Sequence, residues 1–501
     1  MEPEAVDAEL RRHLVRHGLL EAAQPTCWKI ENSKLSGRGV IASRDIAVDE
    51  LVYADAAVVQ GPRCYSKYLP LCVSCYKTGC VLFPCDRGCG LPVCSEVCQN
   101  DPHHVEAECA YLKGLEPTCG SGWSLELLQA VVPIRALMLP KELTRVFYSL
   151  QCHEAAQHGR EVDMLKSNVK GDIDADDEEL MRRVCRAMDT NSFETAVIRG
   201  GKSTSLRALF PVGALTNHQC VPNTRHIVNA EGELLVYAAV PIAEGQEITM
   251  SYADVLWDTQ MRRHFLLATK HFACQCPRCT DVTECGSLLG ALSCAIDNCQ
   301  GNLLPNTPLS LNCPWTCNEC GLIIKGRQIS SIRAGIIAAT EEFKYENPRK
   351  VLRFVNKELS LLVPETNYVM MEMMFRIVSL FGRAEGCTWS ELTDEELNIK
   401  ILYCKKLIQC LDTLNCGNCT KKGLILYELY CANAEKVKRI SSKESNVCTL
   451  LKNQIDSSAN ENVLLEAMKI LKSDIVAPHD YREIYNEKLL LTQKIEDIKI
   501  I

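Results

Sequence analysis

The sequence predicts an α+β protein of several domains, with a β-rich and cysteine-rich N-terminal part and a helical C-terminal part. Its 501 residues exceed what one hydrophobic core usually supports. Most of its 30 cysteines lie before residue 321, where short β-prone stretches also occur. From residue 330 onward, long amphipathic patterns with few glycines indicate helices.

Composition and charge narrow the class of protein. The hydrophobic fraction of 47% and the charged fraction of 24% are those of a globular protein. A formal net charge of −8 argues against direct nucleic-acid binding and favours basic protein segments as partners. The acidic start, without a signal sequence or an uncharged apolar run of about 18 residues, predicts a soluble, intracellular protein with no membrane span. In a reducing compartment, clustered cysteines indicate metal binding rather than disulfides.

The first 71 residues contain a short helical pattern and a glycine-flanked turn. The pattern at 9–17 is charged, so we expect residues 1–26 to form a solvated extension. Residues Gly37, Arg38 and Gly39 precede β-prone alternation, which suggests a tight turn between strands where backbone can approach a ligand. An ordinary hairpin turn is the alternative for this short motif.

Residues 72–109 carry eight metal-ligand side chains in four pairs, enough for two tetrahedral zinc sites. The segment is too short to build an apolar core, so zinc is expected to replace one. We expect pairs one and three to share one ion and pairs two and four the other, with either His103 or His104 in the last pair. The predicted ligands are Cys72, Cys75, Cys85, Cys89, Cys94, Cys98, His104 and Cys109.

Two further cysteine groups follow a helical segment over residues 110–185. An isolated cysteine followed about fifty residues later by Cys-x-Cys-x-x-Cys supplies a closed tetrahedral set: Cys220, Cys274, Cys276 and Cys279. Two later pairs resemble a zinc ribbon: Cys294, Cys299, Cys317 and Cys320. Cys313 is close enough to compete there, and unmetallated loop thiols are the alternative. The sequence thus predicts three zinc ions, and four if the ribbon binds one.

Helical patterns fill the C-terminal part, at residues 351–362, 368–381, 395–411, 422–438, 462–471 and 479–490. Helices of this length suggest a bundle or a tetratricopeptide-like superhelix, although no 34-residue consensus recurs. We expect a role in packing and interaction. The pair Cys416 and Cys419 has no partner pair, so chance placement is favoured.

The order of these motifs resembles the SET and MYND domain (SMYD) lysine methyltransferase family, in its arthropod SmydA-like branch. The motifs are Gly-Arg-Gly, the cysteine finger, Asn-Ser-Phe at 191–193, Asn-His-x-Cys-x-Pro-Asn at 217–223, Glu-x-x-x-x-Tyr at 247–252 and Cys-x-Cys-x-x-Cys. The resemblance implies a SET β-fold split by a MYND zinc finger. The implied regions are a SET N-terminal part (27–71), the finger (72–109), a helical insert (110–200), the SET C-terminal core (201–265), a post-SET region with the ribbon (266–325) and a tetratricopeptide-like domain (330–501).

The resemblance also implies an activity, S-adenosylmethionine-dependent protein-lysine N-methylation of histone or non-histone proteins. It implies Tyr252 as the catalytic tyrosine facing the transferred methyl, and Phe272 against the adenine. The implied cofactor-binding residues are Gly37, Arg38, Gly39, Asn191, Asn217, His218, Tyr252 and Phe272. Implied partners are a lysine-containing protein or peptide and Pro-rich peptides at the finger. A monomer in the cytoplasm, the nucleus or both is expected.

The chain departs from the family pattern at three positions. Ser36 stands where many members have a basic residue, and Gln219 replaces a serine. Lys270 stands where many active members have a second pocket tyrosine, and a cation there would repel both a lysine substrate and the sulfonium. These departures motivate an alternative function, a catalytically weak or inactive scaffold that recruits partners in transcriptional regulation.

Overall fold

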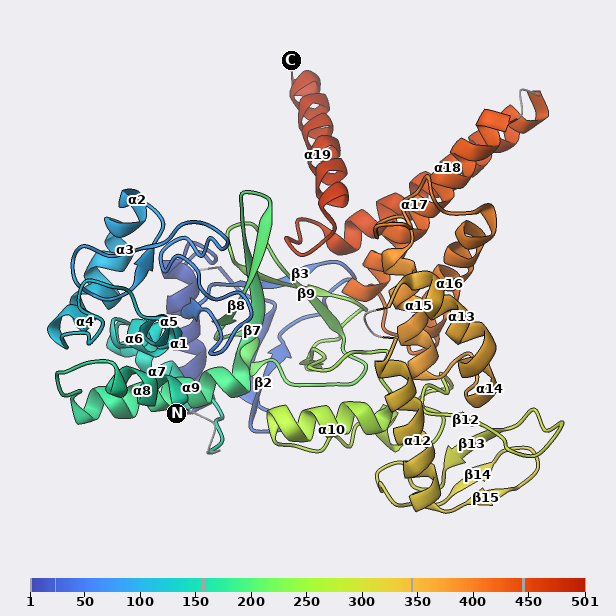
Figure 1. Ribbon diagram of the computed structural model, residues 1–501, viewed down its shortest axis with the longest axis horizontal. Coiled ribbons are helices and arrows are strands. Elements are labelled where there is room, and N and C mark those ends of the chain that lie inside the picture. The colour runs from blue at the N-terminus through green and yellow to red at the C-terminus, as the bar shows by residue number, and fades with distance from the viewer. Residues whose placement is uncertain (1, 23, 155–158, 344–345, 444–446, 501) are drawn as a thin grey trace.

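The structure, a computed structural model, describes residues 2–22, 24–154, 159–343, 346–443 and 447–500. In Figure 1 the finger and the helical insert lie on one side, the C-terminal helices on the other, and the SET strands between them. Helix α10 (Thr259–Lys270) lies between α9 (Ala175–Asn191) and α12 (Gly326–Glu341). No helix in these described ranges combines the length and apolar character needed to cross a membrane.

Three small antiparallel sheets form the SET region, and each joins strands from both sides of the inserted segments. The first has the order β1 (Trp28–Asn32), β2 (Arg38–Ala42) and β11 (Glu247–Ile248). The second has β3 (Leu51–Asp55), β10 (Leu234–Ala238) and β9 (Thr224–Val228), and the third has β4 (Val59–Gly61), β8 (Lys202–Leu209) and β7 (Phe193–Arg199). The predicted split β-fold is therefore confirmed.

The inserted segments are short elements that share one buried cluster with the SET strands. The finger contains β5 (Phe83–Pro84), β6 (Pro92–Val93), α2 (Glu96–Gln99), α3 (Pro102–His104), η1 (Val105–Cys109) and α4 (Ala110–Gly114). The insert contains α5 (Leu125–Gln129), α6 (Val131–Leu137), α7 (Lys141–Ser149), α8 (Arg160–Ser167) and α9. Asp174 caps α9 by accepting from the backbone N–H of Asp176, so the acidic stretch at 172–179 is a helix start.

The N-terminal helix α1 (Pro3–Arg16) packs into the SET core, against β1 and α7. Val6, Leu10 and Leu14 are buried at four-residue spacing, which gives the helix an apolar stripe. His13 donates from Nε2 to the carbonyl of Ala56 at 3.0 Å, and burial lowers its pKa to about 4. The expected solvated extension is wrong, because charged neighbours obscured this stripe in the sequence.

The region after the SET strands contains α10, α11 (Pro277–Thr280) and a four-stranded antiparallel ribbon. Its strands are β12 (Leu292–Ser293), β13 (Asn302–Pro305), β14 (Trp315–Cys317) and β15 (Ile323–Ile324). The boundary expected between residues 265 and 266 falls inside α10, so a single helix joins the two regions. At its start, Asp258 pairs with Arg333 of α12 at 2.5 Å.

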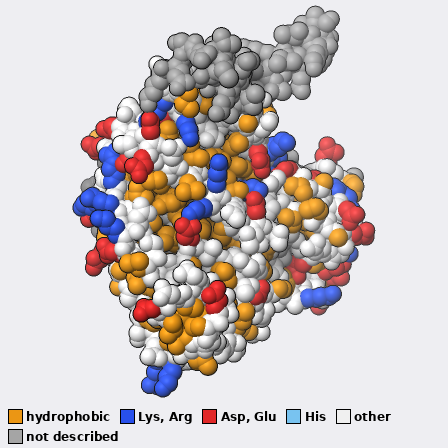
Figure 2. All heavy atoms as spheres, turned by 90° about the vertical axis from the view of Figure 1, so that its right-hand side faces the viewer, with side chains coloured by type: hydrophobic (Ala, Val, Ile, Leu, Met, Phe, Trp, Pro, Cys, Tyr) orange, Lys and Arg blue, Asp and Glu red, His pale blue; other side chains and the backbone are white. Residues whose placement is uncertain are grey.

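The C-terminal part is helical, as predicted, and begins earlier than the sequence pattern suggests, with α12. After it come α13 (Pro348–Phe354), η3 (Val355–Leu359), α14 (Ser360–Leu362), α15 (Tyr368–Leu380), α16 (Asp394–Thr413), α17 (Thr420–Lys443), α18 (Val447–Leu471) and α19 (His479–Ile500). Figure 2 views this side of the molecule, where hydrophobic side chains gather among charges of both signs.

Side-chain and backbone hydrogen bonds attach the C-terminal helices to the SET strands β9 and β10. The guanidinium of Arg225 on β9 donates to the carbonyls of Lys469 and Ile470 at the end of α18, at 3.0 and 3.1 Å. The N–H of Ile475 donates to Val228, and that of Asn418 donates to Ala239 just after β10. The helical part is therefore fixed on the strands of the SET region.

Replacing Leu10 by alanine should lower the free energy of unfolding by about 2–5 kcal/mol, because it empties a fully buried position. The matched control is Val15→Ala on the same helix, where a 38% exposed side chain should change the free energy by only about 0.5 kcal/mol. Urea unfolding measures both. Equal small changes would show that α1 adds nothing to the core.

Candidate active site

A cavity of about 770 Å³ opens where the β1–β2 turn, the ends of α7 and α9, and the segment after α10 meet. Residues 214–215, residues 217–219 and Tyr252 also line it, so the cavity joins segments that are far apart in the chain. Seven of the eight residues predicted to bind the cofactor line this cavity: Gly37, Arg38, Asn191, Asn217, His218, Tyr252 and Phe272. Of the lining residues, the sequence analysis missed the contribution of α7 and the residues after it, namely Ser149, Leu150 and Gln151.

Gly39, the eighth predicted residue, does not line the cavity. A Cβ at this position would lie 2.3 Å from Oε1 of Glu247 and 3.1 Å from Nδ2 of Asn217. The glycine therefore makes room for a side-chain contact behind the cavity wall. Gly37 does line the cavity and has a φ of +52°, in the left-handed region that favours glycine. The two glycines thus have different roles.

The side-chain amide of Asn217 holds the β1–β2 turn against the cavity. Its Nδ2 lies within hydrogen-bond distance of the carbonyls of Ser36 and Arg38, at 3.1 and 3.0 Å, and of Glu247 Oε1, at 2.7 Å. Ser33 donates from its hydroxyl to both carboxylate oxygens of Glu247 at 2.8 Å. Glu247 was missed as a site residue, although it opens the Glu-x-x-x-x-Tyr motif.

Residues 217–224 lie alongside residues 249–250 and hydrogen-bond to them. The N–H of Met250 donates to Asn217 and the N–H of Gln219 donates to Met250, both at 3.0 Å. Nδ1 of His218 accepts from the N–H of Tyr252 at 3.0 Å, and Nε2 lies 3.2 Å from Sγ of Cys220. Because Nδ1 is an acceptor, the ring proton is on Nε2. His218 therefore connects the tyrosine to a cysteine cluster.

Tyr252 belongs to a group of aromatic rings at the wall of the cavity. The ring centroid of His218 lies 5.2 Å from that of Tyr252 and 5.9 Å from that of Phe272. The Tyr252 hydroxyl donates to the carbonyl of Thr216 at 2.8 Å. Burial, with a contribution from Glu247, raises the pKa of Tyr252, so the phenol keeps its proton at neutral pH.

A second cavity of about 180 Å³ shares part of this wall. The residues common to both cavities are Thr190, Asn191, Ala214, Tyr252 and Lys270. Phe193 and His226 line the smaller cavity, with their rings 5.6 Å apart. Burial lowers the pKa of His226 to about 4, so its imidazole is neutral at pH 7. The sequence analysis missed Phe193 as a wall residue and missed His226.

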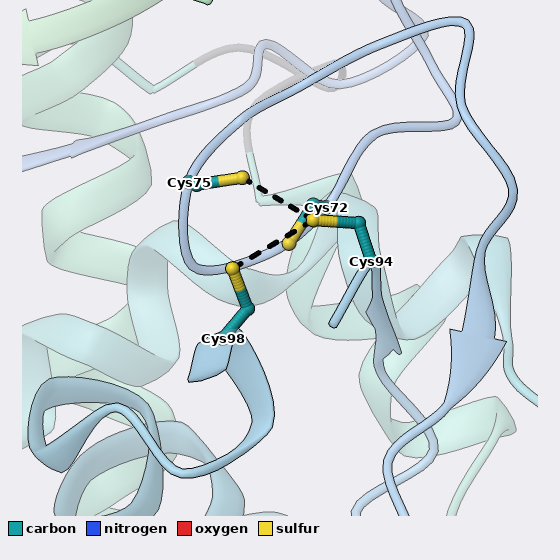
Figure 3. A group of neighbouring side chains, drawn as sticks. All are labelled: Cys72, Cys75, Cys94 and Cys98. Carbon is teal, nitrogen blue, oxygen red and sulfur yellow. Dashed lines mark hydrogen bonds between the residues drawn. The ribbon is translucent and has the colours of Figure 1, made fainter. Parts of the chain in front are cut away.

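The predicted finger ligands are brought together as two separate groups of four. One group is Cys72, Cys75, Cys94 and Cys98, whose sulfur atoms converge in Figure 3. The other is Cys85, Cys89, His104 and Cys109. Within each group the ligand atoms lie within 4.8 Å of one another. This is the interleaved arrangement of the four pairs, with His104 rather than His103 in the second group.

A carboxylate orients the histidine of the second finger group. Nδ1 of His104 donates to Glu108 Oε1 at 3.1 Å, which leaves Nε2 to face the sulfur atoms of Cys85 and Cys89. Arg135 of the helical insert donates to both Glu108 oxygens, at 2.8 and 3.1 Å. A carboxylate behind a histidine is the usual arrangement at zinc sites. The donor set therefore fits zinc.

The two other predicted groups also converge, one beside the larger cavity and one in the ribbon. The first is Cys220, Cys274, Cys276 and Cys279, and the second is Cys294, Cys299, Cys317 and Cys320. Cys313, considered as a competing ligand, is buried but lies outside the ribbon group. Cys416 and Cys419 join no group of this kind in the described part of the chain.

Comparison with known proteins places the chain in a family. The SET domain model matches residues 37–253. The chain is 31% identical over 424 residues to the SET domain-containing protein SmydA-8, isoform A, of Drosophila melanogaster, covering 83% of this chain and 90% of that relative. The chain belongs to the SMYD family of SET domain proteins, in its SmydA-like branch. The SMYD relatives include the N-lysine methyltransferase SMYD2-B of Danio rerio, 27% identical over 49% of this chain and 58% of its own length.

A solved structure, the SET domain of LSMT bound to lysine and AdoHcy, covers 98% of this chain and 93% of its own. Its identity is 11% and its TM-score is 0.27, so membership of the SMYD family rests on the sequence relatives.

In this SMYD chain, two of the three departures from the family pattern change the site little. Ser36 lines the larger cavity and offers its carbonyl to Asn217, a contact that any residue could make. Gln219 also lines the cavity, and its N–H bonds to Met250. Lys270 differs, because its charged side chain reaches the wall between the two cavities.

We expect four zinc ions per chain by metal analysis of the purified protein, one for each group of four ligands. Cys94→Ser should remove one zinc, because it takes a thiolate from a closed tetrahedral set. Cys80→Ser is the matched control in the same finger, since Cys80 belongs to none of the four groups and should retain all four ions. Two zinc ions or fewer in the unmodified protein would contradict the grouping.

Proposed function

We propose that the protein is an S-adenosylmethionine-dependent protein-lysine N-methyltransferase. The observation that supports this most is the pair of cavities that meet at Tyr252, one large and one small. The larger, at about 770 Å³, has the size of a small-molecule or cofactor site. The smaller, at about 180 Å³, would take one side chain. Membership of the SMYD family supports the same assignment.

Lysine methylation requires a wall like the one between the two cavities. A lysine amine has a pKa of about 10.4, so it must lose its proton and its water before it can attack a methyl group. S-adenosylmethionine supplies the electrophilic methyl, on a positively charged sulfur. The chain's own work is positioning, which in-line displacement requires to within about 3–3.5 Å. The buried Tyr252 phenol and the aromatic wall of the smaller cavity would orient the neutral amine and exclude water.

In this proposal the residues have distinct roles. The cofactor lies in the larger cavity against Gly37, Arg38 and Asn191, with Phe272 against the adenine. Asn217 and His218 shape the loop that the cofactor contacts. Tyr252 is the catalytic residue beside the transferred methyl. The zinc ions, three in the finger and post-SET groups and a fourth in the ribbon, are structural, because each set has four protein ligands and no open position.

Calorimetry with S-adenosylmethionine tests cofactor binding. We expect one site per chain, and Asn217→Ala should weaken it at least tenfold, because its amide holds the turn that carries Gly37. The matched control is Asn356→Ala, an exposed asparagine of η3 that should bind the cofactor like the unmodified protein. Absence of binding by the unmodified protein would refute the enzyme assignment.

Methyl transfer to a lysine peptide library tests the role of Tyr252. Tyr252→Phe keeps the ring contacts with His218 but removes the hydroxyl that bonds to Thr216, so the rate should fall by about 100-fold or more. Cofactor affinity should change by less than about threefold. An unchanged transfer rate would show that the hydroxyl plays no part.

The substrate is proposed to be a protein or peptide with an accessible lysine, histone or non-histone. Pro-rich peptides are proposed as partners of the finger. The proposed location is the cytoplasm, the nucleus or both, and the proposed state is a monomer. The net charge of −8 supports basic protein segments as substrates, with no direct nucleic-acid contact.

The alternative function, a weakly active or inactive scaffold, is favoured by one observation, the amine of Lys270 between the two cavities. If that charge impairs catalysis, Lys270→Tyr should raise the rate of peptide methylation severalfold, because it removes a cation that repels the sulfonium. An equal or lower rate in the variant, measured at saturating cofactor, would show that Lys270 does not impair the enzyme.

A further inference from the structure

Lys270 is fixed at the place where the two cavities meet. It is the last residue of α10, and the next residue, His271, has a φ of +60° that ends the helix. The side chain lines both the large and the small cavity, together with Tyr252 and the Thr190–Asn191 end of α9. Its amine therefore occupies the wall at which a transferred methyl and an acceptor lysine would have to meet.

The contacts of this amine are those expected of a methyl-accepting lysine and differ from those of a lysine in a structural ion pair. Nζ donates to the carbonyl of Thr190 at 2.6 Å and lies 5.5 Å from the ring centroid of Tyr252. Among the described residues, no carboxylate forms an ion pair with it, and Asp189, the nearest in sequence to Thr190, pairs with Arg207 instead. An ammonium has three donors, and the Thr190 carbonyl takes one of them.

The surrounding groups favour the neutral form of the amine. Burial, with a smaller contribution from Arg63 and opposed by Asp189, lowers the pKa of Lys270 to about 8. Glu194 and the neutral His226 also line the smaller cavity. A neutral, partly desolvated amine beside a catalytic tyrosine is the nucleophile that lysine methylation requires.

We propose that Lys270 is itself a methylation site, modified in cis by the active site whose wall it forms. This inference rests on the proposed methyltransferase function. The ammonium first loses a proton to water. The lone pair on Nζ then attacks the methyl carbon of S-adenosylmethionine, a C–N bond forms, and the C–S bond breaks with its electron pair passing to sulfur. The products are S-adenosylhomocysteine and a methylammonium at Lys270, which can release its own proton to water.

The position of Lys270 favours modification in cis over modification by a second copy of the chain. Lys270 reaches the wall from inside, through α10, and is only partly exposed. A second copy of the chain would have to present the same helix end to the cavity, whereas in cis the amine needs only to leave Thr190. The reaction should therefore be first order in protein.

The test is to incubate the full-length, zinc-loaded protein with S-adenosylmethionine that carries a deuterated methyl group. After digestion with a protease that does not cut at lysine, mass spectrometry of the fragment containing residue 270 reports the label. We expect label at Lys270, none at this position in Lys270→Arg, and labelling about 100-fold slower or more in Tyr252→Phe. The matched control is Lys202→Arg, which replaces an exposed lysine at the β7–β8 hairpin. In this variant Lys270 should be labelled as in the unmodified protein.

Two further measurements separate cis from trans and identify the titrating amine. The rate constant should be unchanged over a tenfold range of protein concentration. Unmodified protein, mixed with an affinity-tagged Tyr252→Phe variant that is recovered before digestion, should not raise the slow labelling of the Lys270 of that variant. The rate should rise about tenfold per pH unit while Lys270 is mostly protonated and level off above about pH 8, because Lys270 becomes mostly neutral there. If the amine had an ordinary lysine pKa, the labelling rate would keep rising up to about pH 10.

The outcomes distinguish this inference from the proposed function. Label on added lysine peptides while Lys270 stays unlabelled would overturn the inference and leave the methyltransferase in place. Label confined to other lysines of the chain would do the same. Labelling of Lys270 in trans would overturn modification in cis. If calorimetry shows no cofactor binding, both the inference and the proposed function fail.

Discussion

The geometry of the site depends on the hydrogen bonds between residues 217–224 and residues 247–252. These segments come from different parts of the SET region, yet the backbone of Asn217 and Gln219 bonds to Met250, and the Asn217 amide meets Glu247. Glu247 in turn accepts from Ser33 in the β1–β2 turn. One carboxylate therefore links the turn, the loop and the strand that leads to Tyr252. The Asn217 amide joins the same turn and loop directly, through the carbonyls of Ser36 and Arg38.

The cysteine groups extend this support to the segments around the cavity. His218 bonds to Tyr252 on one side and approaches Cys220 on the other, so the post-SET group lies directly behind the tyrosine. The same group fixes the segment that carries Phe272, two residues before Cys274. In the finger, Arg135 of the helical insert reaches the histidine of the second group through Glu108. Metal binding and the shape of the cavity are therefore expected to be coupled.

Local patterns were readable from the sequence, and contacts across the fold were not. The spacing of Cys72, Cys75, Cys94 and Cys98 predicts two pairs of zinc ligands, because a tetrahedral ion needs four ligands; the interleaved grouping was a preferred connectivity that the spacing alone does not fix. The contact of Gly39 with the side chain of Glu247 could not be read from the sequence, because the two residues are more than two hundred positions apart. The burial of α1 was missed because charged neighbours obscure the stripe of Val6, Leu10 and Leu14, and because one of the elements that cover it, α7, lies far along the chain. Likewise, a cation at position 270 was noticed, but its bond to Thr190 depends on how α9 and α10 meet.

The central claim is that the two cavities at Tyr252 are a cofactor site and an acceptor channel. A crystal structure of the full chain with S-adenosylhomocysteine tests it most directly. The account predicts the adenine against Phe272 in the larger cavity and the sulfur directed at the wall shared by Tyr252 and Lys270. A cofactor bound elsewhere, or one whose sulfur points away from that wall, would contradict it.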